Sequence, residues 1–160
     1  MDLNINKGKK YLIKTKLKIP PVIFFAPVIL GGNIENLFFK KFELANTFFV
    51  IVGLMIFFIG ILIMIFSLKE FYLNDESPAP FIDTKKIITT GIFKFTRNPM
   101  YVSFFVSAFG ISTIFSNLGI LLGALVGIFF IHKIVVIEEE LKLEKINDYK
   151  KYKKKTRRWI

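Results

Sequence analysis

Ionisable side chains that could bind a charged ligand stand at the ends of apolar segments in the second half of the chain. Arg97 precedes one apolar run, His132 lies inside the next run, and Glu138-Glu139-Glu140 follow it. Charged groups beside a lipid bilayer are costly to keep, so they are candidates for function by default. A guanidinium suits a carboxylate or another anion, whereas a carboxylate cluster suits a cation or the hydroxyl groups of a sugar.

Each of these residues also has a purely structural explanation. Arg97 can mark the membrane boundary as a snorkelling side chain, and His132 can hydrogen-bond a neighbouring helix. The glutamates can begin a solvated helix in which nearby lysines pair with them. In the functional interpretation, Arg97 lies at the positive N-terminus of a helix that begins near Pro99, because proline disfavours α geometry at Asn98. The residue types alone leave both interpretations open.

The elements that must position these side chains are apolar and long enough to cross a bilayer. The 160-residue chain is 53% hydrophobic, against about 45–50% in a typical soluble domain. Its apolar residues occur in runs, which is typical of an integral membrane protein. The absence of cysteine excludes thiolate chemistry, and a single histidine argues against a zinc site. We therefore expect a membrane protein without a metal site.

The apolar runs predict an all-α, polytopic fold with about four transmembrane helices and an amphipathic cytoplasmic C-terminal helix. The spans are expected at about Pro20 to Phe39, Leu44 to Leu68, Met100 to Phe115 and Leu118 to Ile137. The last two spans form a tight hairpin around Ser116-Asn117. Glycines spaced four apart allow close helix packing, at Gly119, Gly123 and Gly127. The tail is expected to be one helix, because apolar residues recur every third position, at Leu143, Ile146, Tyr149 and Tyr152.

The distribution of lysine and arginine along the chain predicts the orientation of the protein in the membrane and the partner at its surface. They concentrate in segment 1–19, in the loop from Lys69 to Arg97 and after Ile137, so both termini and this loop are expected in the cytoplasm. The single membrane domain then has a basic N-terminal segment (1–19), two spans (20–68) and a cofactor-binding half (69–160). The net charge of +11 lies outside the apolar runs, which favours anionic lipids over nucleic acid as the partner. The high lysine, isoleucine and phenylalanine content suits a prokaryotic inner or plasma membrane, and the sequence does not indicate an oligomeric state.

Taken in order, the motifs of the second half resemble the small integral-membrane methyltransferases that include isoprenylcysteine carboxyl methyltransferase and phospholipid N-methyltransferases. The resemblance covers about residues 78–160. It rests on Pro78-Ala79-Pro80-Phe81, Thr90-Gly91-Ile92-Phe93, Arg97-Asn98-Pro99-Met100-Tyr101, His132, the glutamate run, Tyr149, Tyr152 and Arg158-Trp159. Two positions depart from the family pattern: Phe93 stands where tyrosine is usual, and Ile146-Asn147 stands where Phe-Gly is usual.

The resemblance implies methyl transfer from S-adenosylmethionine to a carboxylate, amine or thiol of a lipophilic acceptor that enters from the bilayer. The implied cofactor-binding residues face the cytosol and are Gly91, Phe93, Arg97, Asn98, Pro99, Tyr101, His132, Glu138 and Glu139. Among them, the expected catalytic residues are Arg97, His132 and Glu139. Arg97 would bind a carboxylate of the cofactor or substrate, His132 would pack on the cofactor or bond it, and Glu139 would hold its cationic or hydroxyl groups. For an amine acceptor, His132 or a glutamate would be the base. The pair of glutamates can be read as Glu138-Glu139 or as Glu139-Glu140.

Two other functions fit the same sequence. The chain could be a non-enzymatic membrane transport or assembly subunit, in which case Arg97→Ala and Glu139→Gln leave function intact. It could also be a related membrane reductase that uses a nicotinamide cofactor. That alternative predicts stabilisation by a dinucleotide and none by S-adenosylmethionine.

Overall fold

The computed structural model describes residues 19–38, 47–79, 82, 84, 86–146 and 148–159, and within these ranges it contains helices and no strand. The elements are α2 (Pro20–Phe38), α3 (Thr47–Leu73), the 3-10 helix η1 (Gly91–Lys94), α4 (Pro99–Phe115), α5 (Leu118–Ile131), the π-helix η2 (His132–Val136), α6 (Ile137–Leu143) and α7 (Tyr149–Lys155). The predicted all-α class is confirmed. The basic segment up to residue 18, residues 39–46 and the motif residues Pro80, Phe81 and Asn147 lie outside the described ranges.

Three helical stretches have the length and apolar composition needed to cross a membrane: Pro20–Phe38, Thr47–Leu73 and Leu118–Leu143. The fourth expected span is α4, which is apolar but has 17 residues, fewer than the roughly 20 that a full crossing takes. α3 runs past its expected end at Leu68. The fourth span continues beyond Ile137 and carries the glutamates within the same helical stretch.

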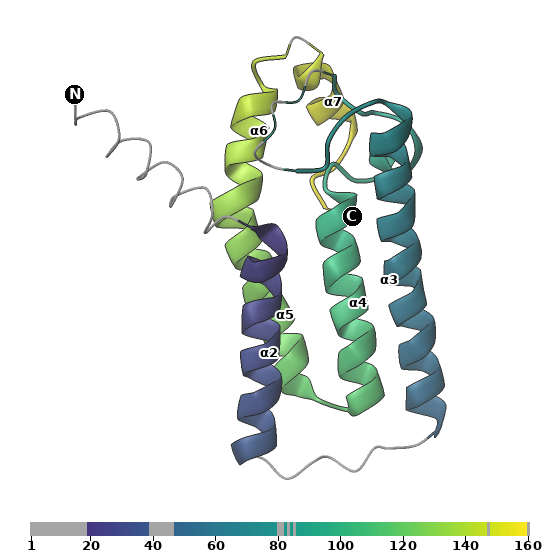
Figure 1. Ribbon diagram of the computed structural model, residues 1–160, viewed down its shortest axis with the longest axis vertical. Coiled ribbons are helices and arrows are strands. Elements are labelled where there is room, and N and C mark those ends of the chain that lie inside the picture. Colours follow the sequence, from purple (N-terminus) through teal and green to yellow (C-terminus); the bar gives the residue numbers. More distant parts are fainter. Residues whose placement is uncertain are drawn as a thin grey trace, which may run out of the picture.

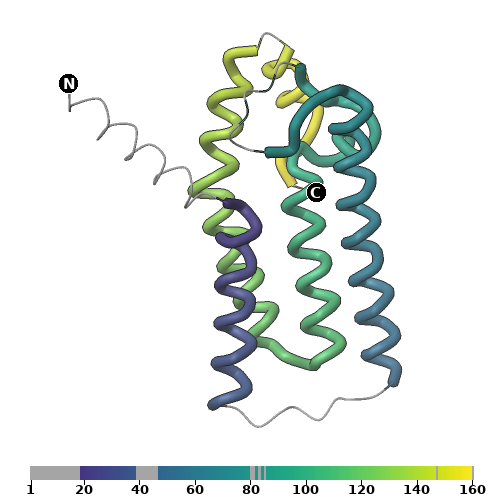
Figure 2. The backbone as a smooth tube through the Cα atoms, viewed as in Figure 1, coloured from purple at the N-terminus to yellow at the C-terminus, as the bar shows by residue number. Residues whose placement is uncertain are grey.

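The long helices pack in two pairs, α3 along α4 and α2 along α5, and α4 then meets α5 (Figure 1). Small residues permit the close approach within each pair. A Cβ atom on Gly110 of α4 would overlap the backbone of α3, and one on Gly123 of α5 would overlap the backbone of α2. This agrees with the packing role expected for the α5 glycines. The tube in Figure 2 shows α4 and α5 joined by a short turn. In this turn the backbone of Ser116 is in the left-handed conformation, and the side chain of Asn117 caps α5 by accepting a hydrogen bond from the backbone N–H of Ile120.

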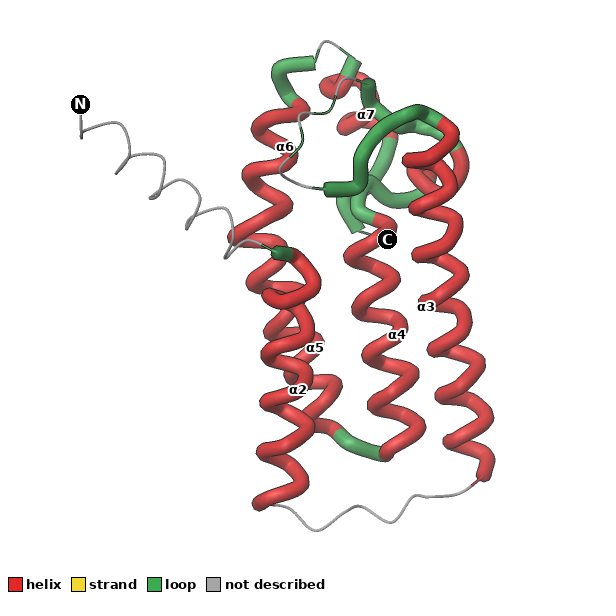
Figure 3. The backbone as a smooth tube through the Cα atoms, in the orientation of Figure 1, coloured by secondary structure: helices red, strands yellow, loops and turns green. Residues whose placement is uncertain are grey.

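The tail is not the single helix that its apolar spacing predicted. α6 ends at Leu143, a turn follows, and α7 begins at Tyr149 (Figure 3). Turn hydrogen bonds replace the helical ones here: the backbone N–H of Ile146 donates to the carbonyl of Leu143 over 2.9 Å, and that of Tyr149 donates to the carbonyl of Ile146 over 3.1 Å. Tyr149 and Tyr152 nevertheless share one buried face of α7, with 1% and 8% of their surfaces exposed.

After α7 the chain returns to the bundle as a C-terminal strap, residues 156–159. The strap pairs with the segment that leads into α4: the backbone N–H of Arg97 donates to the carbonyl of Arg157 over 2.9 Å. The hydroxyl of Thr96 and the side-chain amide of Asn98 both donate to the carbonyl of Arg158. The strap therefore fixes the position of the Arg97 backbone.

Candidate functional site

Arg97 lies immediately before α4, where Asn98 has a non-helical backbone and is followed by Pro99 at the first helical position. Its side chain is only 8% exposed and lies 3.1 Å from Glu140, measured from Nη1 to Oε1. The same Nη1 donates to the hydroxyl of Tyr149 over 3.1 Å. Its Nε is buried and has no hydrogen-bond partner within the described residues. The guanidinium is therefore held in place yet keeps one buried donor.

Glu140 joins three cations at the end of the fourth span. Arg158 of the strap binds it through two hydrogen bonds, Nε to Oε1 at 2.9 Å and Nη2 to Oε2 at 2.8 Å. Arg97 is the second cation, and Lys153 is the third, with its Nζ 3.6 Å from Oε2. The Glu140 side chain is 7% exposed. Cations of the protein therefore satisfy both of its oxygens, and Glu140 links α6 to the segment before α4, to α7 and to the strap.

Glu139 is adjacent in sequence and has a different environment. It accepts a hydrogen bond from the hydroxyl of Tyr101 over 2.9 Å. Tyr101 is a neutral donor that is itself buried in the core, and the described residues supply no ion pair to Glu139. The carboxylate thus keeps acceptor capacity for a ligand.

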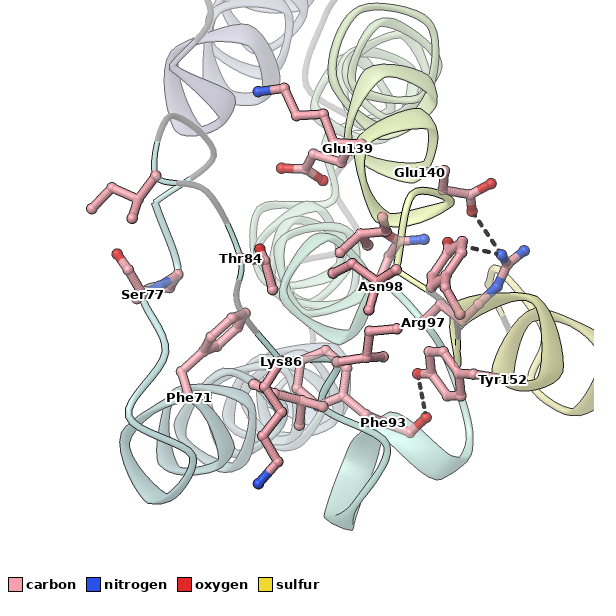
Figure 4. Close-up of a pocket in the computed structure, with 18 of the residues that line it drawn as sticks. Phe71, Ser77, Thr84, Lys86, Phe93, Arg97, Asn98, Glu139, Glu140 and Tyr152 are labelled. Carbon is pink, nitrogen blue, oxygen red and sulfur yellow. Dashed lines mark hydrogen bonds and ion pairs between the residues drawn. The ribbon is translucent and has the colours of Figure 1, made fainter.

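A cavity of about 490 Å³ opens between these residues and the loop that follows α3. Figure 4 shows the carboxylate of Glu139 facing this space, while Glu140 turns toward Arg97. The described lining residues are Phe71, Ser77, Pro78, Ala79, Ile82, Thr84, Lys86, Ile87, Ile88, Phe93, Arg97, Asn98, Glu139, Glu140, Lys142, Leu143, Lys145, Ile146, Tyr149 and Tyr152. Its volume lies within the roughly 300–1,000 Å³ of small-molecule sites, and it mixes apolar walls with a few polar groups as such sites do.

Four of the residues expected to bind a cofactor line this cavity: Phe93, Arg97, Asn98 and Glu139. Glu140, which belongs to the other reading of the glutamate pair, also lines it, whereas Glu138 is exposed on the outside of α6. The π-helix η2 precedes the glutamates and inserts a wider turn. Such a turn changes which side chains share a face, so sequence counting could not decide the pair.

The other expected residues support the cavity from outside. Pro99 starts α4, and Tyr101 positions Glu139. His132 does not line the cavity: its ring packs edge-on against Trp159 at 6.1 Å, and its Nδ1 is buried without a partner among the described residues. Gly91 begins η1 with a left-handed backbone, φ +52°, beside the carboxylate of Glu70.

Two tyrosines of α7, Tyr149 and Tyr152, also line the cavity. The hydroxyl of Tyr152 donates to the carbonyl of Phe93 over 2.6 Å, and the Phe93 ring packs edge-on against Phe71. Burial raises the pKa of Tyr152 above its ordinary value. Burial and then the charge of Glu140 raise the pKa of Tyr149. Both phenols therefore remain protonated at neutral pH.

Gly91→Ala is expected to destabilise the protein by about 1–2 kcal/mol. A left-handed backbone costs an L-residue about that much, and the added Cβ would overlap the Glu70 carboxylate, which also accepts a hydrogen bond from Thr90. Thermal unfolding in detergent measures the loss. An unchanged unfolding temperature would contradict the left-handed geometry.

The sequence model of the phospholipid methyltransferase family matches residues 48–150. The match includes α3, the loop and η1 beside the cavity, and the helices from α4 to the start of α7. It extends further toward the N-terminus than the motifs between residues 78 and 160. No curated protein and no solved structure matches the chain.

Proposed function

Because the chain belongs to the phospholipid methyltransferase family, we propose that it uses S-adenosylmethionine, bound in the cavity around Glu139. The match over residues 48–150 confirms the family expected from the motifs. Membership makes the chain a membrane methyltransferase for lipophilic substrates. The cofactor, the residue roles and the acceptor are our proposal, the acceptor being a carboxylate, amine or thiol of a molecule drawn from the bilayer.

The contrast between two neighbouring glutamates carries this proposal. Glu140 is saturated by cations of the protein, whereas Glu139 faces the cavity with one neutral hydrogen-bond donor. A carboxylate in that position favours a ligand with an ammonium group or a ribose diol, because charge-assisted hydrogen bonds are the strong ones. S-adenosylmethionine has both groups.

The other cavity residues fit the rest of the cofactor. Its carboxylate matches the guanidinium of Arg97, and its adenine ring matches the apolar wall of Ile87, Ile88 and Phe93, all of which line the cavity. The cavity volume of about 490 Å³ is in the range of cofactor sites. The tyrosine that the family usually has at position 93 is replaced by phenylalanine, so the polar contact on this wall falls to the neighbouring hydroxyl of Tyr152.

The chain's own residues would act by alignment and by exclusion of water. When bound, the cofactor supplies an electrophilic methyl group on a positively charged sulfur. Glu139, held by Tyr101, would fix the polar end of the cofactor, and Phe93 and Tyr152 would keep water from the apolar end. A carboxylate acceptor needs no base because it is already ionised. An amine acceptor would react as the neutral amine and release its proton to solvent after the transfer, because Glu139 would already hold the cofactor.

We propose that the cavity faces the cytosol. In the described part of the chain, lysines and arginines begin at Lys69 near the end of α3 and continue through the loop, α6, α7 and the strap. These segments surround the cavity end of the bundle (Figure 1). Such an excess of basic residues marks the cytoplasmic side of membrane proteins.

The direct test is calorimetric titration of the detergent-purified protein with S-adenosylhomocysteine. We expect saturable binding to one site, and transfer of a labelled methyl group from S-adenosylmethionine to lipids of a membrane extract. A parallel titration with a nicotinamide dinucleotide serves as the control. Binding of the dinucleotide without binding of S-adenosylhomocysteine would replace the proposal with the reductase alternative.

Tyr101→Phe is expected to weaken S-adenosylhomocysteine binding about fivefold, because an intramolecular hydrogen bond contributes about 1 kcal/mol. The variant removes only the hydroxyl that orients Glu139. Tyr72→Phe is the matched control, since Tyr72 is 82% exposed and does not line the cavity. Equal affinity of the two variants would show that the Tyr101 hydroxyl does not orient the site.

A further inference from the structure

α7 has two chemically different faces. Tyr149 and Tyr152 are buried against the bundle, while the outer face presents exposed lysines only, at Lys150, Lys151, Lys154 and Lys155. Arg157 of the strap is also exposed. No salt bridge or hydrogen bond within the described residues engages these five side chains.

The chemistry of this basic face favours lipid headgroups over a protein partner. Protein interfaces centre on aromatic and aliphatic side chains, and none of the exposed large apolar residues lies between Asp148 and Trp159. A flexible cluster of lysines suits a diffuse anionic surface. Each basic residue near an anionic membrane contributes about 1 kcal/mol of attraction. α7 lies at the same end of the bundle as the ends of α3 and α6 (Figure 1), so its lysines extend from the region where the helices leave the bilayer.

The buried face of the same helix forms a wall of the cavity. Tyr149 accepts a hydrogen bond from Arg97, and Tyr152 donates one to the carbonyl of Phe93. Figure 4 shows Tyr152 reaching from α7 toward Phe93. α7 has seven residues, too few for a stable isolated helix. The position of α7 therefore depends on its contacts with other groups. A contact on its outer face can change the position of the cavity wall that its inner face forms.

We propose that anionic phospholipid headgroups bind the basic face of α7 and thereby strengthen ligand binding in the cavity. The second half of this proposal rests on the proposed cofactor site; the first half does not. Headgroup binding holds α7 against the bundle, which favours the arrangement in which Tyr149 meets Arg97 and Tyr152 meets Phe93. By linkage, a lipid that binds this arrangement raises the affinity of any ligand that needs it.

The test uses the full chain in lipid nanodiscs of phosphatidylcholine, with or without phosphatidylglycerol. The chain has no cysteine, so Asp148→Cys offers a single exposed position beside α7 for an environment-sensitive fluorophore. We expect the fluorescence to change when phosphatidylglycerol is present and to return when salt is raised. We also expect S-adenosylhomocysteine to bind about tenfold more tightly in the anionic nanodiscs.

A variant with Lys150, Lys151, Lys154 and Lys155 all changed to glutamine should lose both responses. The charge-matched comparison removes two lysines at a time: Lys150 and Lys154 of α7, or Lys69 and Lys94, which are exposed at the same end of the bundle but lie outside α7. If the α7 variant responds like the wild type, the basic face is not the lipid site. If soluble polyglutamate changes the fluorescence and phosphatidylglycerol does not, the partner is an acidic protein and the proposal is wrong.

The two parts of the proposal, lipid binding by α7 and its coupling to the cavity, can be contradicted by different results. A fluorescence response with unchanged S-adenosylhomocysteine affinity would retain lipid binding and overturn its coupling to the cavity. A fluorescence response with no S-adenosylhomocysteine binding in either nanodisc would overturn the cofactor site, and with it the coupling, while the lipid surface stands. Absence of the fluorescence response would overturn the lipid surface itself.

Discussion

Glu139→Gln is expected to weaken S-adenosylhomocysteine binding about 10- to 100-fold while leaving the unfolding temperature nearly unchanged. A hydrogen bond to a charged group contributes about 1.5–3 kcal/mol, which corresponds to that range of affinity. Glutamine keeps the shape of the side chain and can still accept a hydrogen bond from Tyr101. The loss therefore reports the charge that faces the cavity.

Glu138→Gln is the matched control, because it removes the same charge from the neighbouring position on the exposed side of α6. Calorimetry on both variants separates a specific contact from a general change in potential. Equal losses of affinity would mean that Glu139 acts only through long-range electrostatics. No loss in either variant would remove Glu139 from the binding site.

The membrane helices could be predicted from sequence because their signal is local. Runs of apolar residues such as Leu44 to Leu68 indicate a span without knowledge of its neighbours, and the turn at Ser116-Asn117 was equally visible. The short α4 and the break between α6 and α7 were harder. The break consists of backbone turn hydrogen bonds at Ile146 and Tyr149, whereas apolar spacing alone favoured a continuous helix.

The site could be predicted only in part because its contacts join distant segments. Arg97 and the glutamates were identified because a charged side chain near a bilayer has a high free-energy cost. The side chain with which each of them pairs could not be identified in this way. The π-turn at η2 changes which side chains of the following helix share a face, and no residue pattern marked it. The role of Arg158 as the second guanidinium on Glu140 also escaped prediction, since a basic tail does not reveal which of its residues folds back.

The long-range contact at Glu140 leads to the second large effect, which is on stability. Glu140→Gln is expected to destabilise the protein by about 3 kcal/mol, because removing one partner of a buried ion pair leaves the other charge uncompensated. The relevant charge is Arg97, which is 8% exposed. Arg158 is 32% exposed, so water screens it and it adds less. For a chain of this size we expect the unfolding temperature in detergent to fall by about 10 °C.

Two comparisons identify the cause of that loss. Glu144→Gln is the matched control: its partner Lys153 lies 2.6 Å away, but both side chains are 37% exposed, and an exposed pair contributes at most about 1 kcal/mol. The double variant Arg97→Gln with Glu140→Gln removes the stranded charge, so it should be less destabilised than the sum of its two single variants. Additive losses would contradict an ion pair at this position. Subadditive losses, with Glu144→Gln near wild type, would show that the Glu140 carboxylate joins α6 to the strap and to the segment before α4, which leaves Glu139 free to serve the ligand.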